Sequence, residues 1–448
     1  MPPPALPVWL AVALYLVAGC RTEPEAPTDA VPTPAAPPPS TEAPGVLYGR
    51  VVTHGGAVYE GRLRWGGGEE AFWTDTFDGV KAENPWAALV PPGEIEGATR
   101  RATVLGVPVP WAEPEVDLTR PFRARFGDLA RVESVGDGVR GVVEDRAAFA
   151  PVVRVTLKGG AAVDLDRLAS GDFDDGVRVW DRELGVVDLD AREVRAVEFL
   201  PAPRLRGAPD RLRGTVRAGG RDYSGFVQWD RGHSTGADAL VGRAAEGERR
   251  VPFGDVRSVV RDGDGVRVAL RGGRVLALSG TRATGRGFRG VAVDDPRYGR
   301  VLVPWAAFER ADFDRPARPA AGGPAYGDFR PGRPLAGTVT DRAGRRRAGR
   351  LVFDLDESVT TETLDAPAGG VDVSVPFGRV ASVALPDGGG PAVVTLADGG
   401  ALTLDRSGDL GDGNAGVLVF AAGRGRPEYV RWADVARIDF DGAPGGRR

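Results

Sequence analysis

Two acidic loops hold the residue types of this chain that are best suited to chemistry. Asp172-Phe173-Asp174-Asp175-Gly176 and Asp409-Leu410-Gly411-Asp412-Gly413-Asn414 combine carboxylate and amide oxygens with glycines that allow a tight turn. Oxygen ligands on such a loop are what Ca²⁺ prefers in proteins. The candidate calcium ligands are Asp172, Asp174, Asp409 and Asp412. Asp-Gly and Asn-Gly steps also form turns without any metal, so solvated turns are the alternative interpretation.

Catalysis by cysteine or histidine has little support in the composition. The chain has one cysteine, Cys20, and two histidines, His54 and His233, which lie far apart in the sequence in expected loops. A disulfide framework and a Cys nucleophile in the folded body are therefore excluded. A zinc site needs several Cys or His ligands close together, and none is expected here. We predict no cofactor.

Paired carboxylates for glycoside hydrolysis stay open. Such enzymes hold two carboxyl groups about 5 to 10 Å apart. The chain has 62 acidic residues, so some pair will meet this condition by chance, and the sequence singles out none of them.

Large aromatic residues gather within one stretch of the first third of the chain, namely Phe72, Trp73, Phe77, Trp86 and Trp111. Aromatic side chains outside a core can stack on sugars or contact other proteins. Trp73, Trp86 and Trp111 are thus candidate ligand contacts. The alternative is that these side chains cover the open end of the first folded unit.

The charge pattern does not favour nucleic acid as a partner. The 58 basic and 62 acidic residues leave a formal net charge of -4, which gives no strong overall field. One basic cluster, Arg345-Arg346-Arg347, has no interleaved aromatic residues and is typical of a solvated hairpin tip.

These residues belong to a chain built from three copies of one unit. The stretch from Val251 to Val259 recurs at 375–383 and, in altered form, at 126–132. Each copy also has a Gly-Gly turn between alternating apolar segments, which is a hairpin pattern. The expected divisions are module 1 at 46–200 with an insertion at about 71–120, module 2 at 211–314, a linker at 315–334, module 3 at 335–441 and a disordered tail at 442–448.

This pattern predicts an all-β fold. No window has the 3.6-residue apolar period of a helix, whereas 65 Gly and 37 Pro residues fit many short strands and turns. Val303-Pro304-Trp305 echoes Val251-Pro252-Phe253, which suggests half-units. We expect three tandem β modules, each of one or two small barrel-type halves. The recurring stretch predicts a strand, a tight turn or a single 3₁₀ turn, and a second strand, a pattern that resembles SH3-like or Sm-like barrels.

The N-terminus resembles the signal peptide of bacterial lipoproteins. An apolar run ends in Leu16-Val17-Ala18-Gly19-Cys20, where small residues precede a lone cysteine as in a lipobox. The resemblance covers the first 20 residues and implies removal of residues 1–19 and lipidation of Cys20. Residues 20–45 are rich in proline and predict a disordered, extended stalk. The resemblance further implies a lipid-anchored cell-envelope protein, at the outer membrane, on its periplasmic or surface face.

These features favour a membrane-anchored envelope protein that binds or scaffolds other components. Repeated modules on a tether extend a surface and allow multivalent binding. The expected partners are the membrane, through the lipid, and an envelope protein or polysaccharide. Two alternatives are a hydrolase that acts on polysaccharide, with a site near the insertion at 71–120, and a structural protein of the envelope. Binding is expected rather than enzymatic activity.

Overall fold

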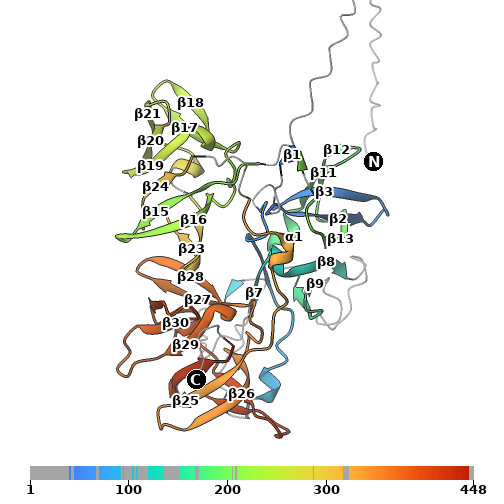
Figure 1. Ribbon diagram of the computed structural model, residues 1–448, viewed down its shortest axis with the longest axis vertical. Helices are drawn as coiled ribbons and strands as arrows, with labels where there is room; N and C mark the ends of the chain where they lie inside the picture. Colours follow the sequence, from blue (N-terminus) through green and yellow to red (C-terminus); the bar gives the residue numbers. More distant parts are fainter. Residues whose placement is uncertain are drawn as a thin grey trace, which may run out of the picture. The chain divides into compact units, whose positions relative to one another are not determined.

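The computed structural model describes residues 40–41, 45–66, 70–91, 94, 103–104, 107–108, 120–135, 152–166, 171–203, 205–206, 209–285, 287–315 and 322–442. These residues form antiparallel strands, tight turns, short 3₁₀ helices and one short α-helix, α1 (Gly171–Asp174) (Figure 1). The predicted all-β class is confirmed. Cys20, Trp111, most of the stalk and residues 443–448 lie outside the described residues. Lipidation and the division into domains therefore stay predictions.

Three sheets repeat one strand order. The order is β10-β9-β8-β13-β2-β3-β11-β12 in module 1 and β31-β30-β29-β34-β25-β26-β32-β33 in module 3. The sheet of module 2 begins with the equivalent order, β21-β20-β19-β24-β15-β16-β22-β23. The same pairing scheme thus occurs three times along the chain, in successive colours in Figure 1.

The strands of module 1 are β2 (Tyr48–Thr53), β3 (Val58–Trp65), β4 (Thr76–Val80), β7 (Pro121–Arg125), β8 (Leu129–Val135), β9 (Val152–Leu157), β10 (Ala162–Asp166), β11 (Val177–Asp181), β12 (Gly185–Leu189) and β13 (Val194–Phe199). Those of module 2 are β15 (Arg213–Ala218), β16 (Arg221–Trp229), β17 (Ala239–Ala244), β18 (Gly247–Pro252), β19 (Val256–Asp262), β20 (Gly265–Leu270), β21 (Val275–Leu278), β22 (Val291–Asp295), β23 (Gly299–Val303) and β24 (Phe308–Phe313).

The strands of module 3 are β25 (Ala336–Asp341), β26 (Arg346–Phe353), β27 (Thr363–Ala368), β28 (Val371–Pro376), β29 (Val380–Ala384), β30 (Ala392–Leu396), β31 (Ala401–Leu404), β32 (Val417–Phe420), β33 (Glu428–Val430) and β34 (Val435–Phe440). Short pairs outside these sheets are β1 (Ser40–Thr41) with β14 (Leu205–Arg206), and β5 (Thr103–Val104) with β6 (Val107–Pro108). The 3₁₀ helices are η1 (Ala87–Leu89), η2 (Phe126–Asp128), η3 (Phe253–Asp255), η4 (Arg282–Thr284), η5 (Tyr326–Asp328), η6 (Phe377–Arg379), η7 (Gly408–Leu410) and η8 (Trp432–Asp434).

The recurring stretch folds as the predicted strand, 3₁₀ turn and strand. Pro252 ends β18, where its missing N–H removes no central ladder bond, and η3 follows directly. The ring of Phe253 is buried against Trp229, with ring centroids 6.1 Å apart. Phe126 of η2 contacts Trp65 in the same way at 5.7 Å, and Phe377 of η6 contacts Phe353 at 5.3 Å. The stretch therefore supplies the centre of each core.

The two half-units of each module exchange strands. In module 2, β15 and β16 are completed by β22, β23 and β24, which come from the second half of the repeat. In turn, β20 and β21 are completed by β17, β18 and β19 from the first half. An isolated bridge between Arg243 and Ser279 joins β17 to β21, and β19 pairs with β24 in the centre. Each module is thus two interleaved five-stranded halves.

Modules 2 and 3 share a continuous sheet. The edge of β23 pairs with β28 in register from Arg300 and Ser374 to Leu302 and Asp372, which extends the module 2 sheet to ten strands. Gly299 begins β23 with a φ of +81°, and a Cβ there would lie 2.4 Å from the carbonyl oxygen of Ser374. A glycine therefore allows β28 to approach. In the part of the chain that the structure describes, no helix is long and apolar enough to cross a membrane.

Candidate functional site

One sheet surface recurs in all three modules and is defined here as the outer face. It consists of the side chains of β3, β11 and β12, or of their equivalents, that point away from the module's own core. Its members are Arg62, Arg64, Arg178, Trp180, Val186 and Asp188 in module 1; Phe226, Gln228, Ala292, Asp294, Arg300 and Leu302 in module 2; and Arg350, Val352, Leu418, Phe420 and Tyr429 in module 3.

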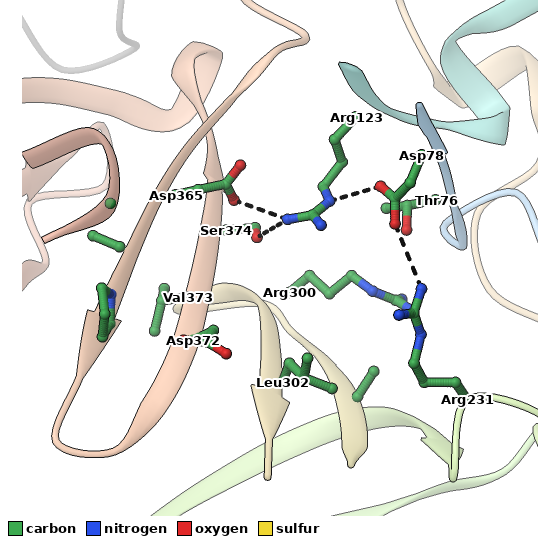
Figure 2. Close-up of a pocket in the computed structure, with 14 residues that line it drawn as sticks. Thr76, Asp78, Arg123, Arg231, Arg300, Leu302, Asp365, Asp372, Val373 and Ser374 are labelled. Atoms are coloured by element: carbon green, nitrogen blue, oxygen red, sulfur yellow. Dashed lines mark hydrogen bonds and ion pairs between the residues drawn. The ribbon is translucent and has the colours of Figure 1, made fainter. Parts of the chain in front are cut away.

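The outer face of module 2 forms one wall of a cavity of about 290 Å³ (Figure 2). Ala292, Arg300 and Leu302 supply this wall. The antiparallel strand pair β4 and β7 of module 1 and the hairpin β27–β28 of module 3 supply the other walls. The remaining lining residues are Thr76, Asp78, Arg123, Arg231, Asp365, Ala366, Pro367, Asp372, Val373, Ser374 and Gly408. We call this space the junction cavity.

Arg123 on β7 connects two modules across the junction cavity. Its Nε lies 2.7 Å from Oδ1 of Asp78, and its Nη1 lies 3.4 Å from Oδ1 of Asp365 and 3.3 Å from Oγ of Ser374. Figure 2 shows the guanidinium between the two carboxylates. Burial alone would lower the pKa of Arg123, but the charges of Asp78 and Asp365 raise it above its usual value. Arg123 therefore stays charged.

Two of the predicted calcium ligands accept hydrogen bonds from the backbone N–H groups of Asp78 and Asp365. Asp172 on α1 accepts a hydrogen bond from the backbone N–H of Asp78, with 2.6 Å between the nitrogen and Oδ2. Asp409 on η7 accepts one from the backbone N–H of Asp365, also at 2.6 Å. The two loops thus hold β4 and β27 in the same way in modules 1 and 3.

Burial raises the pKa of both Asp172 and Asp409. Burial and the nearby charge of Asp78 raise the pKa of Asp172 to about 7. Burial and the charge of Asp365 raise the pKa of Asp409 well above its usual value. The other two candidate ligands, Asp174 and Asp412, are exposed. Within the described ranges, no group of three or more His, Cys, Asp or Glu side chains is placed to hold a metal ion.

Two further arginines line the junction cavity. Arg300 lies 2.9 Å from Asp294 and donates a hydrogen bond to Oε1 of Gln228 at 2.5 Å. Arg231 reaches Oδ2 of Asp78 at 3.5 Å. With Arg123, three guanidinium groups face the carboxylates of Asp78, Asp365 and Asp372, so the lining is charged but balanced.

A second, larger cavity of about 460 Å³ shares Thr76, Arg123, Arg300 and Ser374 with the junction cavity. We call it the arginine cavity, because five arginines line it, namely Arg123, Arg125, Arg213, Arg300 and Arg379. Its only lining carboxylates among the described residues are Asp294 and Asp295, and its apolar walls are Phe226, Pro296, Pro324 and Pro376.

Arg379 is held in this cavity by backbone carbonyl groups. It donates hydrogen bonds to the carbonyl oxygens of Pro296 and Arg297, and it forms no ion pair with any described carboxylate. Burial lowers its pKa and the charge of Arg125 acts in the same direction, while the charges of Asp398 and Asp295 oppose them. A guanidinium next to an apolar wall binds carboxylate or phosphate groups well. The arrangement suits an anion with an apolar body.

A third cavity of about 250 Å³ adjoins the other two and is acidic. Glu357 and Asp409 line it, together with Asp78, Glu362 and Asp365. Burial and the charge of Asp409 raise the pKa of Glu357 well above its usual value. Beside it, the buried Lys81 of module 1 lies 2.5 Å from Asp356 and 2.7 Å from Glu362. This ionic cluster joins module 1 to module 3.

The structure separates the aromatic candidates. Trp73 is fully buried and packs on Phe199 and Tyr326, with ring centroids 6.2 and 4.6 Å away. Trp86 lies on the outer face of module 3, where its ring is 6.1 Å from that of Phe420. Trp111 lies outside the described residues. Neither Trp73 nor Trp86 lines the junction cavity or the arginine cavity.

The sequence reasoning missed Arg123, Arg300 and Asp365 as site residues. A signal was present, because Arg123 and Ser374 occupy the same position before the recurring Phe of modules 1 and 3. Their cross-strand partners are Asp78 and Asp365, so the strand pairs β4–β7 and β27–β28 bring equivalent carboxylates to Arg123.

The fold and these cavities define an all-β repeat protein whose modules jointly enclose charged spaces. Comparison of the chain with known protein families, with characterised proteins and with solved structures finds no significant similarity to any of them.

Proposed function

We propose that this is a membrane-anchored binding or scaffold protein of the cell envelope, and that it binds an anionic ligand in the arginine cavity. The observation that carries the proposal is the lining of that cavity, where five arginines face two carboxylates and an apolar wall. Its volume of about 460 Å³ lies in the range of small-molecule sites. A sugar carboxylate or a phosphate ester has the matching charge and size.

Calorimetric titration of the full chain tests the ligand. Glucuronate and inorganic phosphate are the two anionic probes, and glucose is the neutral control. We expect one anion to bind with a Kd below about 1 mM, and Arg379→Gln to weaken it about tenfold because a charge-assisted hydrogen bond is lost. The matched control is Arg346→Gln, which removes an exposed arginine far from the cavity lining. Equal binding of glucose, or unchanged binding by Arg379→Gln, would contradict the proposal.

Membrane attachment rests on the lipobox resemblance around Cys20. Cells fed a palmitate analogue should label the protein, because the acyl chain is attached to this sulfur. Cys20→Ala should abolish the label. A labelled Cys20→Ala protein would refute the anchor.

A polysaccharide hydrolase is the second candidate, and one observation favours it. Asp78 and Asp172 lie together at the base of the insertion in module 1, and burial and the charge of Asp78 raise the pKa of Asp172 to about 7. A carboxyl group with a raised pKa is what general acid catalysis uses. Cleavage of an acidic polysaccharide by the full chain, lost in Asp78→Asn without loss of fold, would favour this candidate. A structural role in the envelope is the remaining alternative if no ligand binds.

A further inference from the structure

The outer faces of the three modules differ in what covers them. In module 2 the outer face forms the walls of the junction and arginine cavities. In module 3 it is covered by residues of the module 1 insertion, which include Trp86 and Val90. In module 1 the outer face is partly exposed: Val186 is 56% exposed, and Leu184 beside it is 68% exposed.

The contacts of the module 1 insertion with the outer face of module 3 show which side chains this face accommodates. The ring of Trp86 packs at 72° to that of Phe420, and the guanidinium of Arg350 lies 4.0 Å from the Phe420 centroid and 5.6 Å from the Trp86 centroid. Val90 packs in the same apolar cluster. Glu94 completes the contact through an ion pair with Arg431, with 2.8 Å between Oε1 and Nη2. The occupant is thus a segment with an aromatic, an apolar and an acidic residue.

Module 1 has the same platform. Arg62 and Trp180 are cross-strand partners in β3 and β11, as Arg350 and Phe420 are in β26 and β32. The guanidinium of Arg62 lies 3.8 Å from the Trp180 ring centroid. Among the described residues, no aromatic ring from another module packs on Trp180. The equivalent of the Trp86 contact is therefore open here.

Among the described residues, no strand pairs with the outer edge of β12 beside this platform. Gly185 begins β12 with a φ of +76°, at the position that Gly299 occupies in β23. A Cβ at Gly185 would meet nothing within 4 Å, whereas one at Gly299 would meet the backbone of β28. Val186 follows directly and is the cross-strand partner of Trp180. Arg62, Trp180 and Val186 thus form one row that ends at the last strand of the described sheet.

Arg62 forms no ion pair within 4.0 Å with a carboxylate of the described residues, and its guanidinium stacks on Trp180. Burial and the charge of Arg64 lower its pKa to about 10, against the opposing charge of Asp238. Arg64 itself is paired, 3.0 Å from Asp238 of module 2. A partly buried cation without a carboxylate gains from an added anion.

We propose that the row of Arg62, Trp180 and Val186 is a docking site for an extended segment of a partner protein. The segment presents an aromatic side chain to Trp180, as Trp86 of the insertion does to Phe420 in module 3. It also presents a carboxylate to Arg62, whereas the carboxylate of the insertion, Glu94, pairs with Arg431. This surface is separate from the arginine cavity, so the proposal does not depend on the anionic ligand proposed for that cavity.

The probe is a synthetic peptide with the sequence of residues 84–94 of this chain, titrated into the full-length protein. We expect binding with a Kd between about 10 µM and 1 mM, the range of small peptide contacts. Trp180→Ala should weaken binding about tenfold, because it removes a stacking contact and part of the apolar area. Arg62→Gln should weaken it severalfold and reduce its dependence on salt.

Two controls separate the docking site from its equivalent in module 3. Phe420→Ala should leave peptide binding unchanged, and a peptide with Trp86→Ala should bind poorly to every protein variant. Circular dichroism of Trp180→Ala verifies that the partly exposed substitution leaves the fold intact. Peptide binding that is lost in Phe420→Ala but kept in Trp180→Ala would overturn the proposal. Absence of binding at 1 mM peptide, which lies at the upper end of the expected range, would overturn it too.

Discussion

Asp172 and Asp409 show how a residue chosen for one chemistry can serve another. Both are candidate oxygen ligands in the sequence, and in the structure both accept a hydrogen bond from the backbone N–H of a residue whose carboxylate lines the junction cavity. Their residue types and their loop could be read from the sequence. Their acceptor role could not, because it depends on a strand more than 40 residues earlier that only the tertiary fold brings near.

The raised pKa of Asp172 predicts a pH-dependent stability. Its folded pKa of about 7 lies above the usual value of 3.8, so the folded state binds the proton more tightly. This contribution is fully present below about pH 4 and is lost as the pH rises to about 7. Asp172→Asn keeps an oxygen acceptor for the N–H of Asp78 but removes the charge. At pH 8 the variant should be the more stable protein, with an upper limit of about 4 kcal/mol.

Urea unfolding of wild type and Asp172→Asn at pH 4.5 and pH 8 checks this prediction. The difference between the two proteins is the measured quantity, because other acidic groups affect both equally. A difference that does not change between the two pH values would show that Asp172 is not desolvated.

At the scale of elements, local pattern predicted hairpins and the 3₁₀ turns but not the pairing of strands. The alternation of Val266 and Val268 with exposed Arg267 marks β20 as a strand with one buried side. A strand of one half could pair with the strands of its own half or with the equivalent strands of the other half. The sequence carries the same apolar pattern in both, so the exchange of β17–β19 and β22–β24 could not be predicted.

The contact between β23 and β28 leads to a matched pair of substitutions. Gly299→Ala and Gly185→Ala place the same side chain at equivalent positions with positive φ, at +81° and +76°. The backbone strain is therefore similar, on the order of 1 kcal/mol. Only Gly299→Ala also drives a Cβ into the carbonyl of Ser374. We expect it to lower the free energy of unfolding by about 1 to 3 kcal/mol more than Gly185→Ala does.

Denaturant unfolding of both variants gives the comparison. Equal decreases in the free energy of unfolding would mean that β28 does not contact the start of β23. A larger loss for Gly185→Ala would indicate that the edge of β12 is covered, which would also count against the docking site.

At the scale of the whole molecule, repetition and composition predicted the architecture, but the contacts between modules could not be foreseen. The charged residues that join modules, such as Lys81 with Asp356 and Arg64 with Asp238, are ordinary polar positions in their own strands and loops. Their partners lie in other copies of the repeat, at distances along the chain that no local pattern encodes.

Residues 210–318, expressed alone, should fold as a β-rich unit because they contain both interleaved halves of module 2. Removal of module 3 uncovers the edge of β23 and the apolar side chains of Ala292 and Leu302. An unpaired edge with apolar neighbours promotes association. We therefore expect a β-sheet circular dichroism spectrum together with concentration-dependent oligomers in sedimentation velocity. A random-coil spectrum would show that module 2 depends on its neighbours.

The interleaving of halves resembles a segment swap between two chains. A single half-repeat has enough strands to form one five-stranded unit. In each module, however, three of its strands pair with the other half, and three strands of the other half pair with it. This is the arrangement that two identical short chains adopt when they swap a segment, and the hairpin from Asp262 to Gly265 is the short tie between them in module 2. Each module therefore has the form of a swapped dimer joined into one chain, and this form occurs three times along the sequence.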